Sequence, residues 1–330
     1  MPGVNLVTGG AGFIGSHLVE RLLAEGEAVR VLERPGAAVD HLPLERIEVV
    51  RADIRDRGAV RAALRGCRHV YHLAANPNLW VRDRQEFDAV NRQGTVHVLE
   101  AALEAGAERV LYTSTESILA SRVFAGGAVE HLRPRESDVV GPYCLSKLRA
   151  EQAAFRLADR GAPVIVVSPT LPVGPGDRNQ TPPTRMTITF CRGRLPAIMD
   201  CRLNFVDVRD VAVGMVAALR HGRPGVRYVL GAANLQLRAW LGLVGPLVGR
   251  TPPRWAVPYP LALAAGRISE WIADHVTGRM PIATVTGVRL TRRCLHFDPQ
   301  ASLTELGLRP RPVEESARDA VDWYRKVGWI

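Results

Sequence analysis

The chain has 330 residues and a mass of 36.1 kDa, and 47% of its residues are hydrophobic and 23% charged. This length and composition predict one large globular domain or two coupled ones. No run of eighteen apolar residues is present, which excludes a typical membrane-spanning helix, and no signal peptide is evident at the N-terminus. The net charge of +10 comes almost entirely from dispersed arginines, so we expect a solvated basic surface and no nucleic-acid partner.

The five cysteines are scattered and form neither a CxxC pair nor a metal-ligand spacing. An odd, dispersed set in a chain of this length predicts reduced thiols, a cytoplasmic location and no bound metal.

The first predicted elements enclose a glycine-rich segment, TGGAGFIGS, at 8–16. β-Branched residues over 4–8 predict a buried strand, and apolar spacing over 13–24 predicts a helix. Glycines at such a junction allow a tight turn and a close approach of phosphate to the helix N-terminus. A purely structural turn is the alternative. The glycines that fit a variant of the dinucleotide fingerprint are Gly9, Gly12 and Gly15.

Strands and helices then alternate along the first half of the chain. This alternation predicts an α/β fold with a doubly wound parallel (Rossmann) sheet, covered by helices on both faces, with ligands at the carboxyl ends of the strands. Further strands are predicted over 28–33, 47–50, 69–73, 110–113 and 164–167, and further helices over 56–65, 86–105 and 142–160.

The pattern loosens past residue 168, where prolines over 169–183 predict a loop. Strands over 204–208 and 227–230 are predicted around a helix. Residues 236–297 are helical with proline interruptions, and 313–326 predict a closing amphipathic helix.

These elements suggest two interleaved regions. We expect a dinucleotide-binding domain over 1–170, completed by parts of 203–235, and a smaller, mainly substrate-binding region over 171–330. The apolar stretch at 257–265 is too short to span a bilayer and contains prolines, so it predicts a core or pocket-lining helix.

The clearest catalytic pattern is Tyr143-Cys-Leu-Ser-Lys147 on a predicted helix. Residues i and i+4 lie one turn apart on the same face. An ammonium there would lower the Tyr143 pKa and give an acid/base group usable near neutral pH. Lys147 is one of only two lysines in an arginine-rich chain, and the two cations are not equivalent. Ser114 and Thr115 end the preceding strand, where a hydroxyl can bind the reacting oxygen. A surface tyrosine over a solvated lysine is the alternative.

Several short motifs occur in a fixed order along essentially the whole chain. They are TGGAGFIG at 8–15, Asp53-Ile54, HLAA at 72–75, NxxGT at 91–95, TST at 113–115, YxxxK at 143–147, PVGPG at 172–176, and DxxA at 298–301 followed by Leu306-Gly307. In this order they resemble the extended short-chain dehydrogenases/reductases, the NAD-dependent epimerase/dehydratase family. HLAANPNLW at 72–80, PTLPVGPGD at 169–177 and YVLGAANLQL at 228–237 look closest to its hopanoid-associated sugar-epimerase and dihydroflavonol-reductase-like branch.

The resemblance implies a role for each matching position. Tyr143 is the acid/base, Lys147 is its electrostatic partner and a ribose ligand, and Thr115 is the hydroxyl partner. Asn91 is expected to be structural and to tie strands together. His72 belongs to the strand motif and is expected to be a core histidine, with a catalytic role as the alternative. The implied cofactor-binding positions are Gly9, Gly12 and Gly15 at the pyrophosphate, Asp53 and Ile54 at the adenine, and Ala74 and Ala75 at the nicotinamide side, together with Phe13, Ile14, Leu73, Lys147 and Pro169.

The end of the second predicted strand indicates which cofactor is used. Glu33 lies 18 residues after Gly15 (33 minus 15), where a carboxylate can accept hydrogen bonds from both ribose hydroxyls of NAD. The same carboxylate would repel the 2′-phosphate of NADP, whereas Arg34 would attract it. We expect NAD as the cofactor, with NADP as the alternative.

The chain departs from the family pattern at substrate positions. Glu116-Ser117 stands where sugar 4,6-dehydratases place an acid and then a glutamate, so the second acid of water elimination is missing. Leu203-Asn204 replaces the Arg-Asp pair of many nucleotide-sugar enzymes, and Ser168 replaces an asparagine. Each change weakens the case for a diphosphate-linked sugar, which needs charge-assisted donors.

We therefore expect an oxidoreductase that transfers hydride at a secondary alcohol or ketone of a small, largely uncharged substrate, acting as a homodimer. Apolar walls are expected from Leu79-Trp80, Phe190 and the helix after Pro260. The candidate substrate residues are Trp80, Thr115, Glu116, Ser168 and Arg185.

Two alternatives stay open from the sequence. One is a nucleotide-sugar epimerase or dehydratase with tightly bound NAD, whose phosphates Arg185, Arg192, Arg292 or Arg293 would hold. The other is a non-catalytic dinucleotide-binding sensor, which the presence of both Tyr143 and Lys147 disfavours.

Overall fold

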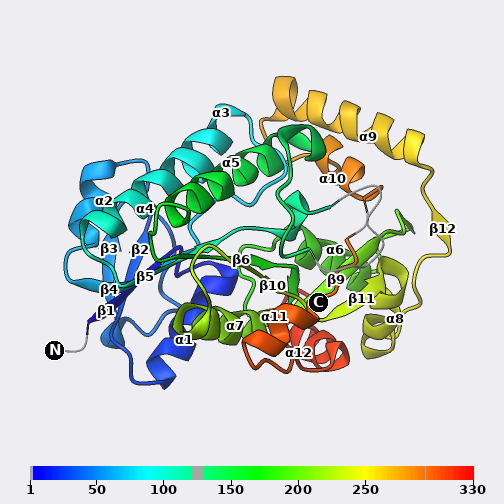
Figure 1. The fold of residues 1–330 in the computed structure, drawn as a ribbon. Helices are drawn as coiled ribbons and strands as arrows, with labels where there is room; N and C mark the ends of the chain where they lie inside the picture. The colour runs from blue at the N-terminus through cyan, green and yellow to red at the C-terminus, as the bar shows by residue number, and fades with distance from the viewer. Residues whose placement is uncertain (1–2, 121–128, 294) are drawn as a thin grey trace.

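The computed structural model describes residues 3–120, 129–293 and 295–330, and its centre is a seven-stranded parallel sheet (Figure 1). The strand order reverses between the neighbours β1 and β4, which confirms the predicted doubly wound topology. In spatial order the strands are β10 (Arg227–Leu230), β6 (Val164–Pro169), β5 (Arg109–Thr113), β4 (Cys67–His72), β1 (Val4–Thr8), β2 (Val29–Glu33) and β3 (Glu48–Arg51).

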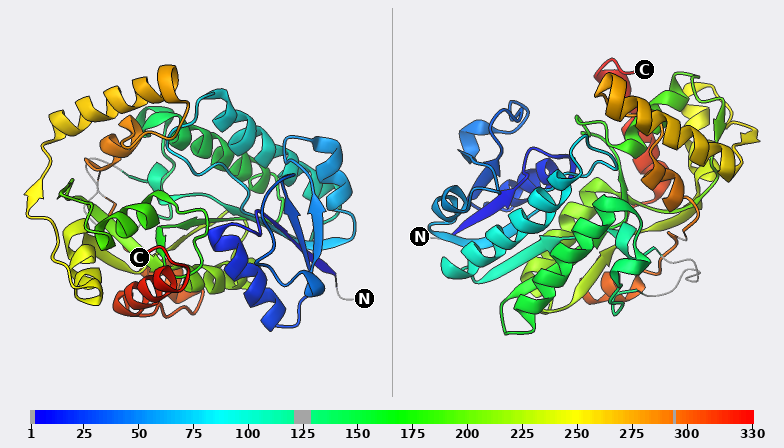
Figure 2. Two further views of the ribbon diagram at one scale, coloured as in Figure 1. Left: turned by 180° about the vertical axis from the view of Figure 1, so that it is seen from behind. Right: turned by 90° about the horizontal axis from the view of Figure 1, so that it is seen from above.

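Helices cover both faces of this sheet (Figures 1 and 2). On one face α1 (Phe13–Ala24) and α7 (Val208–His221) share an apolar core with the strands. On the other, α2 (Arg57–Ala63), α4 (Thr95–Glu104) and α5 (Gly141–Ala158) form a second core. Because both faces are covered, every residue of β6 and β10 is buried, as is usual in parallel sheets.

Smaller elements lie to one side of the large sheet (Figure 1). A three-stranded sheet contains β11 (Ala233–Gln236), β9 (Arg202–Asp207) and β7 (Leu171–Val173), and β8 (Ala197–Ile198) pairs with β12 (Trp255–Ala256). The remaining helices are α3 (Gln85–Phe87), α6 (Pro182–Cys191), α8 (Leu237–Val248), α9 (Tyr259–Ile272), α10 (Val285–Leu290), α11 (Gln300–Glu305) and α12 (Val313–Lys326).

The two halves of the chain are interwoven. From the C-terminal half, α7 packs on the large sheet and β10 extends it, whereas β9 joins the small sheet. The division into two regions at residue 170 stays a prediction.

Three segments differ from the sequence prediction. The proline-rich stretch was predicted as loop but contains β7 and α6, which begins with Pro182-Pro183 because the first helical turn needs no N–H donors from its residues. The predicted helix 86–105 contains a π-helical turn, Asp88–Gly94, that presses Gly94 against Ile54. The helix after Pro260 lies at the periphery with exposed apolar side chains and is not a core helix.

The described residues have neither a membrane-spanning helix nor a cluster of metal ligands. No helix in them is long and apolar enough to cross a membrane. They also contain no group of three or more His, Cys, Asp or Glu side chains arranged to hold a metal ion.

Candidate active site

The glycine turn between β1 and α1 is closely packed. Gly9 has a φ of +72°, and a Cβ there would come 2.9 Å from the Ala74 nitrogen. A Cβ on Gly15 would lie 2.1 Å from the Gly9 carbonyl oxygen. At Gly12, the N-cap of α1, no side chain of the described residues caps the helix, and its first turn contains no acid. The turn thus leaves the N–H groups and positive end of α1 available to an anion.

Glu33 connects this turn to the end of β2. Its carboxylate is buried and Oε1 accepts a hydrogen bond of 2.7 Å from the Ala11 nitrogen. Burial raises the Glu33 pKa, and hydrogen bonds from the backbone of Ala11 and Arg34 oppose that rise. The Arg34 side chain is exposed. The structure therefore places the carboxylate, and not the guanidinium, against the glycine turn.

The predicted adenine positions follow β3. Ile54 is buried against Gly94. The Asp53 carboxylate accepts two hydrogen bonds from Arg55. Arg55 Nε lies 3.0 Å from Oδ1, and Nη2 lies 2.6 Å from Oδ2. Hydrogen bonds from Arg55 hold the Asp53 pKa below its usual value. Sequence reasoning missed this partner, which limits what the Asp53 side chain can offer a ligand.

The loop after β4 is fixed by a buried chain of hydrogen bonds. Thr95 Oγ1 donates to the Asn91 carbonyl at 2.7 Å and therefore accepts from His72 Nε2 at 2.9 Å. His72 Nδ1 then accepts from Thr8 Oγ1 at 2.7 Å, and that oxygen accepts the amides of the next loop residues. Burial lowers the His72 pKa to about 3, so the ring is neutral. His72 is structural, as the sequence suggested. The amides held by Thr8 belong to Leu73 and Ala74.

Asn91 joins this loop to the helix of the predicted catalytic tyrosine. Its Oδ1 accepts the Asn76 amide at 2.7 Å, and its Nδ2 donates to Ser146 Oγ at 3.0 Å. Ser146 Oγ in turn donates to the Tyr143 carbonyl at 2.7 Å. Asn91 thus ties the segment after Ala75 to α5, and not strand to strand. Sequence reasoning missed Asn76 and Ser146; only the position of Ser146 inside YxxxK gave a signal.

Tyr143 and Lys147 are both buried in the first turns of α5. Lys147 Nζ donates to the Thr113 carbonyl at 2.7 Å and lies 4.7 Å from the centre of the Tyr112 ring. Burial lowers the Lys147 pKa to about 7 and raises the Tyr143 pKa well above its usual value. The expectation that Lys147 lowers the Tyr143 pKa is wrong for this structure, because burial outweighs every other influence on the phenol.

The end of β5 brings a hydroxyl and a carboxyl to the same place. The Thr115 hydroxyl lies near the Tyr143 phenol and opposes the rise in its pKa. Thr115 Oγ1 lies 3.1 Å from both Glu116 Oε2 and Ser117 Oγ, and its one proton can be donated to either. It accepts the Ser117 amide at 3.2 Å. Burial raises the Glu116 pKa to about 7. Glu116 is therefore a buried acid in direct contact with the Thr115 hydroxyl.

The other predicted substrate residues have different surroundings. Ser168, next to Pro169 at the end of β6, is fully buried, and its Oγ has no hydrogen-bond partner among the described residues. The Trp80 indole donates to Asp274 Oδ1 at 3.0 Å. Phe190 packs in an apolar core and lines an open hollow that includes none of the predicted catalytic residues.

The arginines considered for a phosphate clamp are dispersed. Arg185 is exposed and donates to the Gln180 carbonyl. Arg192 donates to the Trp329 carbonyl, and Arg292 lies over the Tyr259 ring. Arg293 lies close enough to Cys144 to lower the thiol pKa, against a larger rise from burial.

At the position of the missing Arg-Asp pair, Asn204 has a structural role. Its Nδ2 donates to Asn234 Oδ1 at 2.7 Å and its Oδ1 accepts the Ala232 amide at 3.0 Å. Leu203 packs among apolar side chains. Neither residue offers a charged donor.

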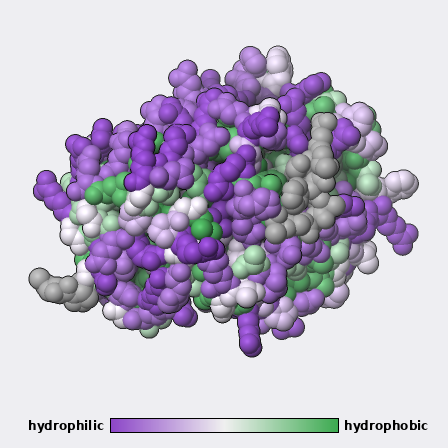
Figure 3. Space-filling model, in the orientation of Figure 1, coloured by the Kyte–Doolittle hydropathy of each residue, from purple (hydrophilic) through white to green (hydrophobic). Residues whose placement is uncertain are grey.

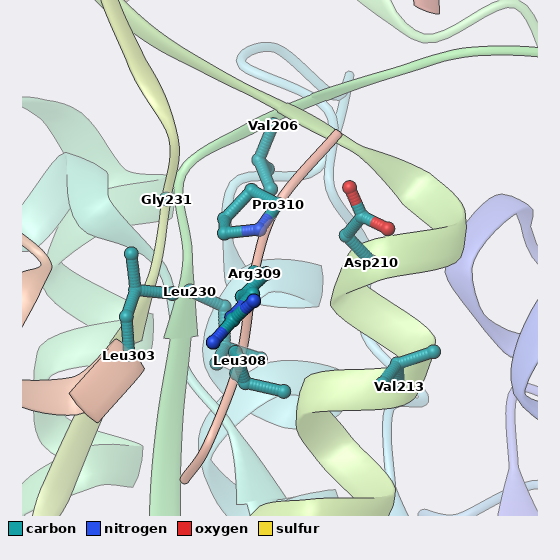
Figure 4. A pocket seen from close by; sticks show the side chains of 9 residues that line it. All are labelled: Val206, Asp210, Val213, Leu230, Gly231, Leu303, Leu308, Arg309 and Pro310. Atoms are coloured by element: carbon teal, nitrogen blue, oxygen red, sulfur yellow. The ribbon is translucent and has the colours of Figure 1, made fainter. Parts of the chain in front are cut away.

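A small pocket lies elsewhere, between β10, α7 and the segment before α12 (Figure 4). None of the predicted site residues lines it. Its wall consists of Val206, Asp210, Val213, Leu230, Gly231, Leu303, Leu308, Arg309 and Pro310.

Comparisons with known proteins bear on this arrangement. The model of the NAD dependent epimerase/dehydratase family matches residues 5–231. A Synechocystis protein described as a candidate dihydroflavonol 4-reductase is 33% identical over 98% of this chain and 95% of its own. Sterol demethylase protein B of Methylococcus capsulatus is 32% identical over 98% and 99%.

A solved structure has a similar fold. The UDP-glucose 4-epimerase of Thermus thermophilus, in complex with NAD, has a TM-score of 0.78 and 26% identity over 98% of this chain and 99% of its own. The chain therefore belongs to the NAD-dependent epimerase/dehydratase family of extended short-chain dehydrogenases/reductases.

Proposed function

We propose that the protein is an NAD-dependent oxidoreductase that transfers hydride at a secondary alcohol or ketone of a small, largely uncharged substrate. The observation that supports this best is the burial of Tyr143 and Lys147 at the start of α5 beside the end of β5. There Lys147 Nζ donates to the Thr113 carbonyl, and Thr115 lies near enough to Tyr143 to oppose the rise in its pKa. A hydroxyl, a phenol and an ammonium at the carboxyl edge of a parallel sheet suit proton transfer to and from a bound oxygen.

The residues present fit a dinucleotide. The uncapped N-terminus of α1 and the tight glycine turn suit a pyrophosphate. Buried Ser168 Oγ and Thr113 Oγ1 have no hydrogen-bond partner among the described residues. Because buried polar groups are normally hydrogen-bonded, a bound ligand suits these two oxygens as a partner. Glu33 at the end of β2 suits the ribose hydroxyls. When bound, the reduced nicotinamide supplies the hydride.

The protein side of the reaction follows from the pKa values. The high pKa of Tyr143 keeps the phenol protonated at neutral pH, so it can donate its proton to a carbonyl oxygen as the carbon is reduced. The Thr115 hydroxyl orients that oxygen. Lys147, once charged, stabilises the phenolate that remains. Asn91 and Ser146 hold Tyr143 in register with the loop after β4.

Several observations support an uncharged substrate. Leu203 and Asn204 provide no charged donor. Arg192 contacts the carbonyl of Trp329, and Arg292 lies over the Tyr259 ring. Two full-length relatives have names that refer to a dihydroflavonol reductase and a sterol demethylase, which suggests a ring ketone or carbinol. A homodimeric state and a cytoplasmic location stay predictions from the sequence.

One alternative rests on a specific observation. The similar fold of a UDP-glucose 4-epimerase and the nearness of Arg293 to Cys144 favour a nucleotide-sugar epimerase. A non-catalytic sensor has no such support.

The test is a turnover assay of the purified full chain. With NADH and a panel of cyclic and aromatic ketones, we expect ketone-dependent loss of nicotinamide absorbance. Calorimetric titration of the NAD-loaded protein with UDP, dTDP and GDP and their glucose conjugates should show no micromolar binding. Micromolar binding of one nucleotide, together with no ketone reduction, would favour the epimerase.

A further inference from the structure

The exposed apolar side chains are concentrated on one segment. Among the described residues, eight of the nine large hydrophobic side chains that are exposed lie between 255 and 282, and the ninth is Leu44. The exposed fraction is 78% for Trp255, 64% for Leu261 and 58% for Trp271. The eight are Trp255, Leu261, Ile268, Trp271, Ile272, Val276, Met280 and Ile282. We call this set the apolar ridge. Figure 3 shows hydrophobic residues interspersed with hydrophilic ones where α9 lies in Figure 1.

Helix α9 has an arrangement opposite to that of an ordinary surface helix. Its large apolar residues recur at helical spacing on the solvent side, from Leu261 through Ile268 to Trp271. Its buried side has small residues, Ala262 and Gly266. A Cβ on Gly266 would lie 3.5 Å from the backbone before α10. The small face allows close packing on the protein, and the large face remains without a partner among the described residues.

Within residues 250–292 the exposed charges have one sign. Between residues 250 and 292 the only acids are Glu270 and Asp274, and both are turned to the protein. Glu270 Oε1 accepts the Val285 amide at 2.8 Å, and Asp274 accepts the Trp80 indole and Arg84. The exposed charged residues of this stretch are Arg250, Arg254, Arg267, Arg279, Arg289 and Arg292.

We propose that the apolar ridge docks the protein on the surface of a lipid bilayer that contains anionic headgroups. Exposed tryptophans and aliphatic side chains on a helix bounded by arginines suit the headgroup–acyl boundary. A second copy of the chain suits the ridge less well, because a two-fold contact would bring together two arginine-rich segments that have no exposed acid of their own between residues 250 and 292. This proposal concerns location at a surface and goes beyond the proposed catalytic function.

Vesicle sedimentation tests the proposal with the full chain. Wild-type protein should pellet with vesicles of phosphatidylcholine and phosphatidylglycerol and much less with phosphatidylcholine alone. Because each arginine near an anionic surface adds roughly fivefold to affinity, Arg267→Glu should lower binding by at least that factor. Arg65→Glu, which changes an exposed arginine on another face, is the matched control for net charge.

A second set of variants tests how much the apolar side chains contribute to vesicle binding. Ile268→Ser combined with Trp271→Ser should lower the partition coefficient by at least about tenfold, since two large side chains no longer enter the interface. Leu44→Ser is the control for an exposed apolar residue elsewhere. Brominated lipid should quench wild-type tryptophan fluorescence, and Trp271→Phe should remove part of that quenching.

Three outcomes would overturn the proposal. The first is wild-type protein that stays in the supernatant with anionic vesicles. The second is equal loss of binding in the ridge variants and their controls. The third is a dimer in sedimentation velocity that Ile268→Ser dissociates, in a protein that no anionic vesicle binds, which would assign the ridge to a second copy.

Discussion

At the scale of single residues, we expect the ionisation of Glu116 to decide whether the Thr115 hydroxyl donates to its carboxylate, in competition with Ser117 Oγ. When ionised, Glu116 accepts the Thr115 proton across the 3.1 Å contact, and that proton is not available to a substrate. When protonated, Glu116 can donate to Thr115 Oγ1 and free the hydroxyl for the reacting oxygen. Because burial raises the Glu116 pKa to about 7, this exchange falls within the working pH range.

Glu116→Gln should remove a pH dependence of ketone reduction. In wild-type protein we expect kcat/KM to fall as pH rises through about 7, because the carboxyl loses the proton that lets it donate. Glutamine donates at every pH, so the part of this fall that Glu116 causes should disappear. The part that comes from Lys147, whose pKa burial lowers to about 7, should remain. The control is Glu45→Gln, at an exposed glutamate. A pH profile of Glu116→Gln identical to that of wild-type protein would show that Glu116 does not control the hydroxyl.

The same substitution has a consequence for stability. The Glu116 pKa is raised from 4.5 to about 7 on folding, so its contribution to stability is fully present below pH 4.5 and is lost as pH rises through 7. Relative to Glu116→Gln, wild-type protein should lose about 2–3 kcal/mol of unfolding free energy between pH 5 and pH 8. Denaturant unfolding of both proteins at the two pH values measures this. A constant difference would mean that Glu116 is not buried.

Glu33 should set the cofactor preference. Its buried carboxylate would face the extra phosphate of NADPH, and at ~4 Å and an effective dielectric of ~20 this repulsion is about 4 kcal/mol per unit charge before screening. We expect wild-type protein to bind NADH more tightly than NADPH by at least about tenfold. Glu33→Ala should narrow the ratio, and Glu48→Ala on the next strand should not. Tighter binding of NADPH by wild-type protein contradicts the assignment.

At the scale of elements, the contact between α1 and the glycine turn depends on the absence of a side chain at Gly15. A Cβ there would lie 2.1 Å from a backbone oxygen, so α1 would have to move. Gly15→Ala should abolish NADH binding in fluorescence titrations and lower the unfolding free energy by about 1–3 kcal/mol.

A matched glycine provides the control. Gly242 lies in α8 with no atom within 4 Å of an added Cβ, so Gly242→Ala should retain binding and raise stability by about 0.5–1 kcal/mol. If Gly15→Ala bound NADH like Gly242→Ala, the turn would not hold the pyrophosphate.

The sequence predicts elements well where one physical signal dominates. A continuous apolar run identifies β6, and helical spacing identifies α1 and α12 with the bounds that the structure has. The sequence prediction fails at α6, because a pair of prolines predicts a loop unless the pair lies in the first turn of a helix. It fails at α9, because apolar spacing does not say whether the apolar side faces inward or outward.

At the scale of the whole molecule, the candidate site is made of residues far apart in the sequence. Strand ends and YxxxK spacing place Thr115, Tyr143 and Lys147 without a structure. The links between them, through Asn91 and Ser146, depend on how α5 packs beside the loop after β4. The raised pKa of Tyr143 follows from burial, which no local pattern reveals.

The measurement that tests this account most directly compares Tyr143→Phe with wild-type protein. Ketone reduction and NADH affinity are measured on the same preparations. Because only the proton donor is removed, we expect kcat/KM to fall by about a hundredfold or more while the dissociation constant for NADH stays nearly unchanged. Retention of more than about a tenth of the wild-type rate would contradict the assignment of Tyr143 as the acid/base.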